Sequence, residues 1–318
     1  MTQPTPPEDR SRLVDTVLAA QRFFLEGATK SEIAVELGIS RFKVARILDE
    51  ALREGIVRIE IDAIPEVDEV LSHELAVAMG IRSAVVVRAG YGQASFQRSQ
   101  LGRTCANVLA STLVEADVLG ISWGRTLHSM VGFLPSLPGC AVVQLVGSVP
   151  TLELAVNSVE LVRRVAECSA GPVYPLHVPL IVESPETATA LRAEPYVRRT
   201  IEMFPLVTRA IVGIGAWIPG GSTVRAALSK ADAAALDAAG AVADCCSIVL
   251  DRDGNQVRAA GMPERCIALG VEGLRLVPDV VGVSAGVSKV EPIRATLRSG
   301  LVHRLVTTEE TARLLLVS

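Results

Sequence analysis

The stretch IAVELGISRFKVARILDEALREGI, residues 33–56, predicts two short helices joined by a tight turn. Apolar residues at helical spacing give each helix one buried face: Ile33, Ala34 and Leu37 in the first, and Val44, Ile47, Leu48 and Leu52 in the second. Gly38 breaks the first helix, and Ser40 is a favourable N-cap for the second. The small side chain of Ala34 lets the helices cross closely. The stretch therefore predicts a helix-turn-helix whose second helix is free to enter a DNA major groove at its first turn.

The outward side of that second helix carries the residues expected to contact DNA, which are Ser40, Arg41, Phe42, Lys43 and Arg46. A plain helical hairpin would need only the apolar spacing, whereas this segment adds a cap and three cations close to a helix start. Residues 1–60 contain nine Lys or Arg against ten Asp or Glu, so the positive field is local. A single copy should therefore bind DNA weakly, and a symmetric oligomer would be needed.

Length and composition favour two globular domains. The chain has 318 residues, is 49% hydrophobic with a mean hydropathy of +0.39, and is only 3% aromatic, which predicts an aliphatic core of helices on a sheet. The net charge of -4 excludes a nonspecific nucleic-acid coat but not a small basic reading head. Six cysteines without a C-x-x-C pair indicate reduced core residues rather than zinc or disulfides. No apolar run reaches the ~18 residues of a membrane span, and no signal-peptide core is present, so we expect a cytoplasmic location without membrane contact.

Periodicity and turn residues give the domain boundaries. We expect a disordered, proline-rich arm over residues 1–10 and a winged helix-turn-helix over residues 11–62. Its first helix covers about 11–26, and GIVRIEI at 55–61 alternates as a strand or wing. A connecting helix at 67–80, ended by Gly80, opens the effector-binding and oligomerisation domain, residues 63–318.

The larger domain alternates apolar strands with helices. Strands are predicted at 83–89, 116–122, 141–147, 172–176, 209–215, 243–250 and 279–285. Helices are predicted near 96–115, 153–167, 223–239, 263–270 and 289–299. Near-continuous apolar strands are typical of a sheet that is buried on both faces. The fold class is therefore α/β, an open, mostly parallel, Rossmann-like sheet behind a helix-turn-helix.

In such a sheet, ligands bind beyond the carboxyl ends of the strands. The clearest such end is LGISWGRT at 119–126, which offers Ser122, Trp123, Gly124, Arg125 and Thr126 to a phosphate or to polyol hydroxyls. A tight strand-to-helix turn in which Trp123 only packs is the alternative interpretation.

Four further strand ends contribute weaker candidates. They are Gly147 and Ser148 after one strand, Gly213 and Gly215 after another, Asp244 as an acceptor for sugar hydroxyls, and Lys289 as a phosphate ligand at a helix start. A solvated surface lysine is the alternative for Lys289, and the turn at 251–255 is interpreted as a hairpin turn.

The segments LGISRFKVARILDEALREGIVRIEI, LGISWGRTL, GAVADCCSIVLDRDGNQV and VVGVSAGVSKVEPIRATLRSGLVHRLVTTEETARLLL together resemble the SorC family of sugar-responsive bacterial transcription regulators. The resemblance covers nearly all of residues 10–318. It implies a winged helix-turn-helix followed by a domain related to sugar-phosphate isomerases and deaminases, usually assembled as a tetramer or dimer. Members typically bind a phosphorylated sugar that changes their affinity for operator DNA.

Carried over by position, the family's phosphate loop falls on Ser122, Gly124, Arg125 and Thr126, its aspartate on Asp244, and its late phosphate-contacting lysine on Lys289. Ala243 stands where a glycine is usual, and Cys245 and Cys246 replace larger aliphatic residues, which puts the contact of Asp244 in doubt. Some relatives hold an aldehyde sugar through a lysine in the middle of this domain. No lysine occurs between residues 44 and 229, so we expect reversible noncovalent binding.

Two functions follow from these observations. The first is a DNA-binding regulator of carbohydrate metabolism controlled by a phosphorylated sugar or polyol, with double-stranded operator DNA as its partner and no cofactor or metal. The second is a sugar-phosphate isomerase-like enzyme with an accessory helical domain. Such an enzyme needs a general base near the sugar carbons, yet the four histidines, at 73, 128, 177 and 303, are scattered. His128 follows the loop at 122–126, where packing or capping is its expected role. We therefore expect no catalytic residues and no enzyme activity.

Overall fold

The computed structural model describes residues 7–57, 65–88, 94–149 and 158–317. The chain divides into two compact units, Met1–Ala63 and Ile64–Ser318. No helix among the described residues is long and apolar enough to cross a membrane.

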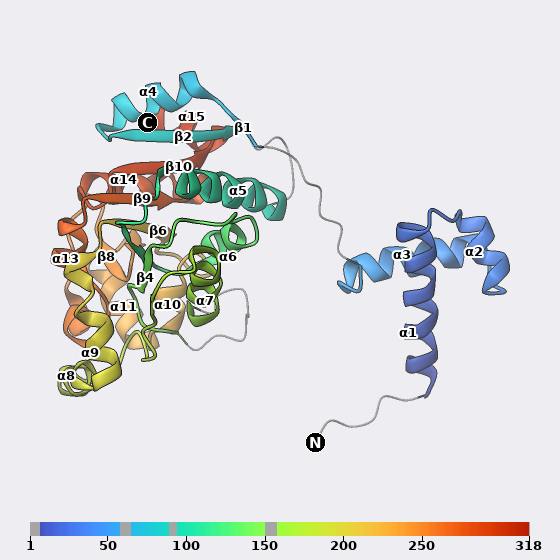
Figure 1. Ribbon diagram of the computed structural model, residues 1–318, viewed down its shortest axis with the longest axis horizontal. Coiled ribbons are helices and arrows are strands. Elements are labelled where there is room, and N and C mark those ends of the chain that lie inside the picture. The colour runs from blue at the N-terminus through green and yellow to red at the C-terminus, as the bar shows by residue number, and fades with distance from the viewer. Residues whose placement is uncertain (1–6, 58–64, 89–93, 150–157, 318) are drawn as a thin grey trace. The chain divides into compact units, whose positions relative to one another are not determined.

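The first unit is helical (Figure 1). It contains α1 (Pro7–Ala20), a π-helical turn η1 (Gln21–Leu25), α2 (Lys30–Glu36) and α3 (Arg41–Arg53). Thr29 and Glu32 form a capping box at the start of α2, and the Ser40 side chain caps α3 by accepting from the Lys43 backbone N–H at 3.2 Å. Ala19, Ala20, Ile33, Val44, Ile47 and Leu48 form its core. The predicted pair of crossing helices is confirmed.

Three details of this unit differ from the expectations. The first helix begins at Pro7, so it starts within the arm expected over 1–10; proline suits a first helical position. Leu52 is 41% exposed, and Ala51 is buried instead. The 3.6-residue period of the helix places position 51, and not position 52, on the buried face of α3. Gly55–Val57 forms a turn and bend rather than a strand, and the rest of the expected wing, residues 58–61, lies outside the described residues.

The second unit is built on a ten-stranded sheet within the described residues. Its main path runs β1-β2-β10-β9-β6-β3-β4-β5, and every pair on that path is parallel except β1 with β2. The strands are β1 (Glu66–Val67), β2 (Ser83–Arg88), β3 (Val118–Ile121), β4 (Ala141–Gln144), β5 (Val173–Tyr174), β6 (Arg209–Ala216), β7 (Ala243–Cys245), β8 (Ile248–Leu250), β9 (Asp279–Val283) and β10 (Arg304–Thr308). The predicted open, mostly parallel α/β fold is confirmed.

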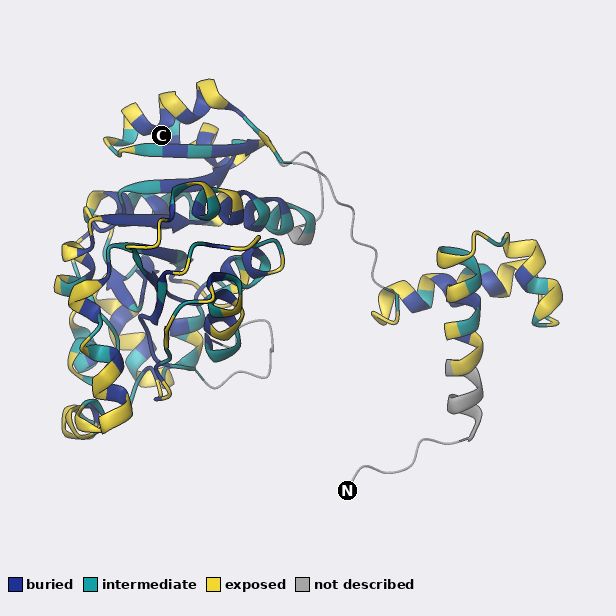
Figure 2. Ribbon diagram, viewed as in Figure 1, coloured by how far each residue is buried: buried dark blue, intermediate teal, exposed yellow. Residues whose placement is uncertain are grey.

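Helices cover both faces of this sheet (Figure 1). They are α4 (Glu69–Met79), α5 (Ala94–Thr112), α6 (Arg125–Val131), α7 (Ser158–Ser169), α8 (Pro185–Ala193), α9 (Pro195–Ile201), α10 (Thr223–Ala227), α11 (Lys230–Ala238), α12 (Met262–Arg265), α13 (Gly270–Leu276), α14 (Val290–Arg298) and α15 (Glu309–Val317), with short 3-10 turns η3 (Phe204–Leu206), η4 (Ala259–Gly261) and η5 (Val287–Lys289). Adjacent strand residues such as Val280 and Val281 belong to the two different cores, so the central strands are buried on both sides (Figure 2).

Several predicted elements need correction. The run at 243–250 is a β7–β8 hairpin, antiparallel to β6, because Cys246 and Ser247 adopt φ of 51° and 64° and form a two-residue turn. Its apolar sequence contains no glycine or asparagine to mark that turn. The helix expected at 223–239 is divided into α10 and α11. The helix expected at 263–270 ends at Arg265 as α12, since Cys266 and Ala268 form β-bridges, and α13 begins only at Gly270. The elements β10, α6, α8, α9 and α15 were not predicted.

Ion pairs close the amino-terminal edge of the central strands. The Arg209 guanidinium lies 2.9 Å from carboxylate oxygens of both Asp117 and Asp279, and Asp279 also accepts from Arg304 Nε at 2.8 Å. These pairs join β6, β9 and β10 at their starts. The opposite, carboxyl-terminal edge is where the cleft opens.

Candidate ligand-binding site

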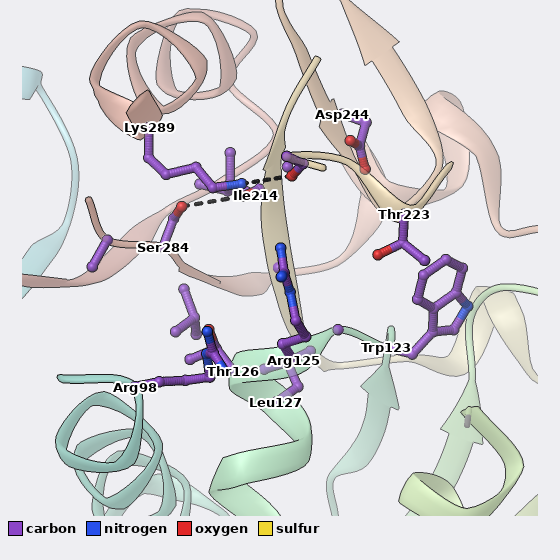
Figure 3. A pocket seen from close by; sticks show the side chains of 16 residues that line it. Arg98, Trp123, Arg125, Thr126, Leu127, Ile214, Thr223, Asp244, Ser284 and Lys289 are labelled. Carbon is purple, nitrogen blue, oxygen red and sulfur yellow. Dashed lines mark hydrogen bonds between the residues drawn. The ribbon is translucent and has the colours of Figure 1, made fainter. Parts of the chain in front are cut away.

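A cleft of about 180 Å³ lies at the carboxyl ends of β3, β6 and β9 (Figure 3). Its walls come from the loop after β3, the end of β6, the loop before α10, the β7–β8 hairpin and the turn η5. Eight residues predicted from the sequence line it: Trp123, Gly124, Arg125, Thr126, Gly213, Gly215, Asp244 and Lys289. Segments that are more than 160 residues apart in the sequence therefore meet at one edge of the sheet.

Three predicted residues do not line the cleft. Ser122 is buried beneath it, and its Oγ accepts a hydrogen bond from the Gly213 N–H at 3.3 Å, which ties the end of β3 to β6. Gly147 packs against the backbone of Leu180, where a Cβ would come within 2.8 Å. Ser148 Oγ shares a hydrogen bond with Ser158 Oγ at 2.8 Å. The chain after β4 therefore turns away from the cleft, and the contacts of Gly147 and Ser148 hold this part of the chain in place.

Two cations of the cleft contact the same backbone segment. Arg125 Nη2 donates to the Gly220 carbonyl at 3.1 Å, and Lys289 Nζ donates to the Gly221 carbonyl at 2.9 Å. Lys289 is half-buried, and this burial lowers the pKa of its ammonium, although the charge of Asp244 acts in the opposite direction. Lys289 is therefore not the solvated surface lysine that the sequence left open. Figure 3 shows Arg125 and Lys289 approaching from different elements.

Asp244 is the one carboxylate among the described residues that line the cleft. It is only 8% exposed, and its Oδ1 has no hydrogen-bond partner among the described residues. Burial raises the pKa of this carboxyl, whereas a hydrogen bond from Ser222 and the charge of Lys289 lower it. A buried acceptor without a partner is costly, so it favours a ligand that donates a hydrogen bond.

Gly215 provides the space for this carboxylate. A Cβ built on Gly215 would lie 2.1 Å from Asp244 Oδ1, which is closer than any real contact. The strands register Gly215 directly opposite Asp244 in the antiparallel pair of β6 with β7. The position of Asp244 therefore depends on the absence of a side chain at residue 215.

Trp123 both lines the cleft and packs. Its ring is 9% exposed, and its Nε1 donates to the Gly147 carbonyl at 2.9 Å. Most of the Trp123 surface is therefore packed inside the protein, as the alternative interpretation expected, while part of the indole lines the cavity (Figure 3).

Three further polar residues line the cleft and were not predicted from the sequence: Arg98, Thr223 and Ser284. Ser284 directly follows β9 and donates to the Ile214 carbonyl at 3.0 Å, so the strand-end rule could have found it. Thr223 begins α10 after a pair of glycines, which is a weaker signal. Arg98 lies within α5, where nothing local distinguishes it from a surface arginine.

His128 is absent from the cleft lining. Its Nδ1 is buried without a partner among the described residues, and burial lowers the pKa of the imidazole. It lies on α6, which packs against α7. This position agrees with the packing role expected for it.

The described residues contain no cluster of histidine, cysteine, aspartate or glutamate that could hold a metal ion. All six cysteines are unpaired, and only Cys168 is not fully buried.

A chain that combines a helix-turn-helix unit with an α/β unit whose strand ends line a polar cleft has the organisation of ligand-responsive DNA-binding regulators. Comparisons with known proteins agree. Residues 66–317 match the family described as "Putative sugar-binding domain" (Sugar-bind). The chain belongs to this family, and its expected place among the SorC regulators is confirmed.

The relatives are similar over nearly their whole length. The sorbitol operon regulator of Klebsiella pneumoniae is 27% identical over 313 residues, which is 97% of this chain and 98% of that protein. The erythritol catabolism regulatory protein EryD of Brucella abortus is 29% identical over 304 residues, 94% of this chain and 95% of that protein. The crystal structure of full-length SorC from Klebsiella pneumoniae has a TM-score of 0.72 at 27% identity and covers 97% of this chain and 99% of that one.

Proposed function

We propose that this chain is a transcriptional regulator of carbohydrate metabolism in which a phosphorylated sugar or polyol binds the cleft and changes the affinity for operator DNA. The convergence of Arg125 and Lys289 with the buried Asp244 carries this proposal. Two cations suit a phosphate, and an unsatisfied carboxylate oxygen suits a sugar hydroxyl. The names of the relatives, which are regulators of sorbitol, erythritol and deoxyribonucleoside genes, support the same class of ligand.

The backbone at Gly220 and Gly221 supplies a means of response. Its two carbonyls accept from the cations that a phosphate would need. A bound phosphate would therefore compete with these carbonyls and free the loop at 217–222 to move. Since a ligand shifts an equilibrium only through differential binding, this exchange is the step that favours one conformation over another.

The remaining assignments belong to the same proposal. Residues 11–62 form the winged DNA-binding head, with Ser40, Arg41, Phe42, Lys43 and Arg46 facing the duplex. Residues 63–318 bind the effector and form a tetramer or dimer, which pairs the heads and adds their weak affinities. The protein works in the cytoplasm and catalyses no reaction; the full-length relatives, all named as regulators, support this reading over the isomerase alternative.

A thermal-shift screen tests the effector. Sugar phosphates, polyol phosphates and their dephosphorylated forms are added to the full-length protein, and a specific ligand at 100 times its Kd should add about 2.7 kcal/mol of stability. Lys289→Ala should lose the preference for the phosphorylated form. Equal shifts by both forms in the wild type would contradict a phosphate site, and steady turnover of the ligand, followed by NMR, would contradict the regulator.

Binding to a duplex enriched from a random library tests the head. Arg46→Ala should lose about 1–3 kcal/mol of specific affinity, because a base-edge contact disappears. Lys43→Ala should weaken all duplexes alike and reduce the salt slope by about one, because a phosphate contact disappears. Full binding by both variants would reject the assignment of the head.

A further inference from the structure

The first turn of α3 exposes a phenylalanine. Phe42 is 73% exposed, although it is one of only six phenylalanines in the chain and burial of such a ring is ordinarily favourable. The Ser40 cap fixes the first turn of the helix, so the position of Phe42 on the helix is set. The exposed ring is therefore open to a partner that contacts α3 from outside.

Phe42 and Arg46 share the face of α3 opposite to the core. The buried residues Val44, Ile47, Leu48 and Ala51 occupy one side of the helix. At about 100° per residue, positions 42 and 46 both project to the other side, one turn apart. Arg46 has only a loose pairing with Glu50, at 4.0 Å, and its side chain is 70% exposed.

Charge around Phe42 indicates the kind of partner. The Arg41 guanidinium lies 5.0 Å from the centre of the Phe42 ring, and Lys43 and Arg46 flank it along the chain. An apolar aromatic side chain surrounded by cationic side chains fits a polyanion that also presents an apolar group. The major groove of DNA has this combination, because thymine carries a C5 methyl group there and phenylalanine is among the side chains that contact it.

We propose that Phe42 determines sequence specificity by contacting the C5 methyl of a thymine in each operator half-site. The inference rests on the proposed DNA-binding function. The rise along α3 between Phe42 and Arg46 is ~6 Å, and base pairs are stacked ~3.4 Å apart. The thymine therefore lies within about two base pairs of the base that Arg46 reads.

Replacing thymine by deoxyuridine tests the contact, because it removes only the methyl group. Full-length protein is used with a duplex enriched from a random library, and each thymine is exchanged in turn. One exchange per half-site should weaken wild-type binding about three- to tenfold. Phe42→Ala should bind the thymine duplex about tenfold more weakly and should no longer distinguish it from the deoxyuridine duplex.

Leu25→Ala is the matched control. Leu25 is another exposed apolar residue of the same unit, 80% exposed, and its replacement should keep both the affinity and the thymine preference. Phe42→Leu should keep part of the preference. Equal wild-type affinity for all exchanged duplexes would overturn the inference while leaving the DNA-binding function intact. A Phe42→Ala protein that changes oligomeric state but keeps the thymine preference would also overturn it, and failure to enrich any duplex would refute the DNA-binding function itself.

Discussion

Asp244 shows how a single residue can oppose stability and serve binding. Its carboxylate is buried against Gly215, and Oδ1 lacks a partner among the described residues. A functional site commonly retains such a group at a cost in stability. The same carboxylate lines the cleft, so a ligand there can donate the hydrogen bond that Oδ1 lacks.

Asp244→Asn should therefore stabilise the ligand-free protein at neutral pH. The pKa of Asp244 is raised by burial, so the folded protein holds the proton more tightly than the unfolded chain. Stability from this group is present below the ordinary aspartate pKa and is lost as pH rises through the raised folded pKa. Asparagine is neutral throughout, so we expect a gain of about 1 kcal/mol at pH 7, or roughly 2–4 °C in Tm.

The Tm difference between the two proteins should shrink as pH falls through the raised pKa of folded Asp244 and should vanish below about 4, the ordinary aspartate pKa, where the carboxyl becomes protonated in both states. Asp244→Asn should also lose most of the ligand-induced shift. A difference in Tm that stays constant with pH would show that the charge of Asp244 is not its cause.

The space at Gly215 gives a second prediction at this scale. Gly215→Ala would place a Cβ against the Asp244 carboxylate and displace that side chain, at a cost of about 1–3 kcal/mol. Gly213 is the matched control, because it lies on the same strand and its added Cβ would meet only the Trp123 carbonyl, at 3.8 Å. Denaturant unfolding of both variants should separate them. Similar losses of stability would mean that alanine in β6, and not the clash, is responsible.

At the scale of elements, local signals set the helices of the first unit. Thr29 and Ser40 cap α2 and α3, and both caps are seen in the structure. Short helices are marginal by themselves, so such caps contribute strongly to their stability.

Ser40→Ala and Thr29→Ala should each lower the stability of the first unit by about 1 kcal/mol, because each leaves a helix start unsatisfied. Only Ser40→Ala should also weaken DNA binding, since it loosens the turn that carries Phe42 and lies before Arg46. Circular dichroism measures the first effect and duplex binding the second. Equal loss of DNA affinity in both variants would indicate that global stability is the cause.

At the scale of the whole molecule, the two units have separate cores. Among the described residues, one small cluster forms the core of the first unit, whereas two extensive clusters form the cores of the second. Both tryptophans, Trp123 and Trp217, belong to the second unit. Tryptophan fluorescence therefore follows the second unit alone.

Heating should reveal two transitions in the full chain. A sugar phosphate should raise the Tm of the transition that tryptophan fluorescence follows. A duplex enriched from a random library should raise the Tm of the other transition, which only circular dichroism detects. Each shift in Tm should grow with ligand concentration. A single transition that both ligands raise equally would show that the units unfold together.

The sequence by itself determined what local signals encode. Helical spacing and caps at Gly38 and Ser40 identified the helix-turn-helix, and apolar runs between helices identified the parallel α/β class. The rule that ligands bind at strand ends also led to Arg125, Asp244 and Lys289. These features depend on neighbours within a few residues, so they can be seen without a structure.

The tertiary structure alone decided which strand ends share a cleft. Because β9, β6 and β3 are neighbours in the sheet, their ends converge, whereas the chain after β4 turns towards Leu180 and removes Gly147 and Ser148 from the site. The tertiary structure alone also decided that β7 pairs with β6 in an antiparallel register, which places Asp244 opposite Gly215. Strand order and register are set by contacts between residues far apart in the chain, and local periodicity carries no record of them.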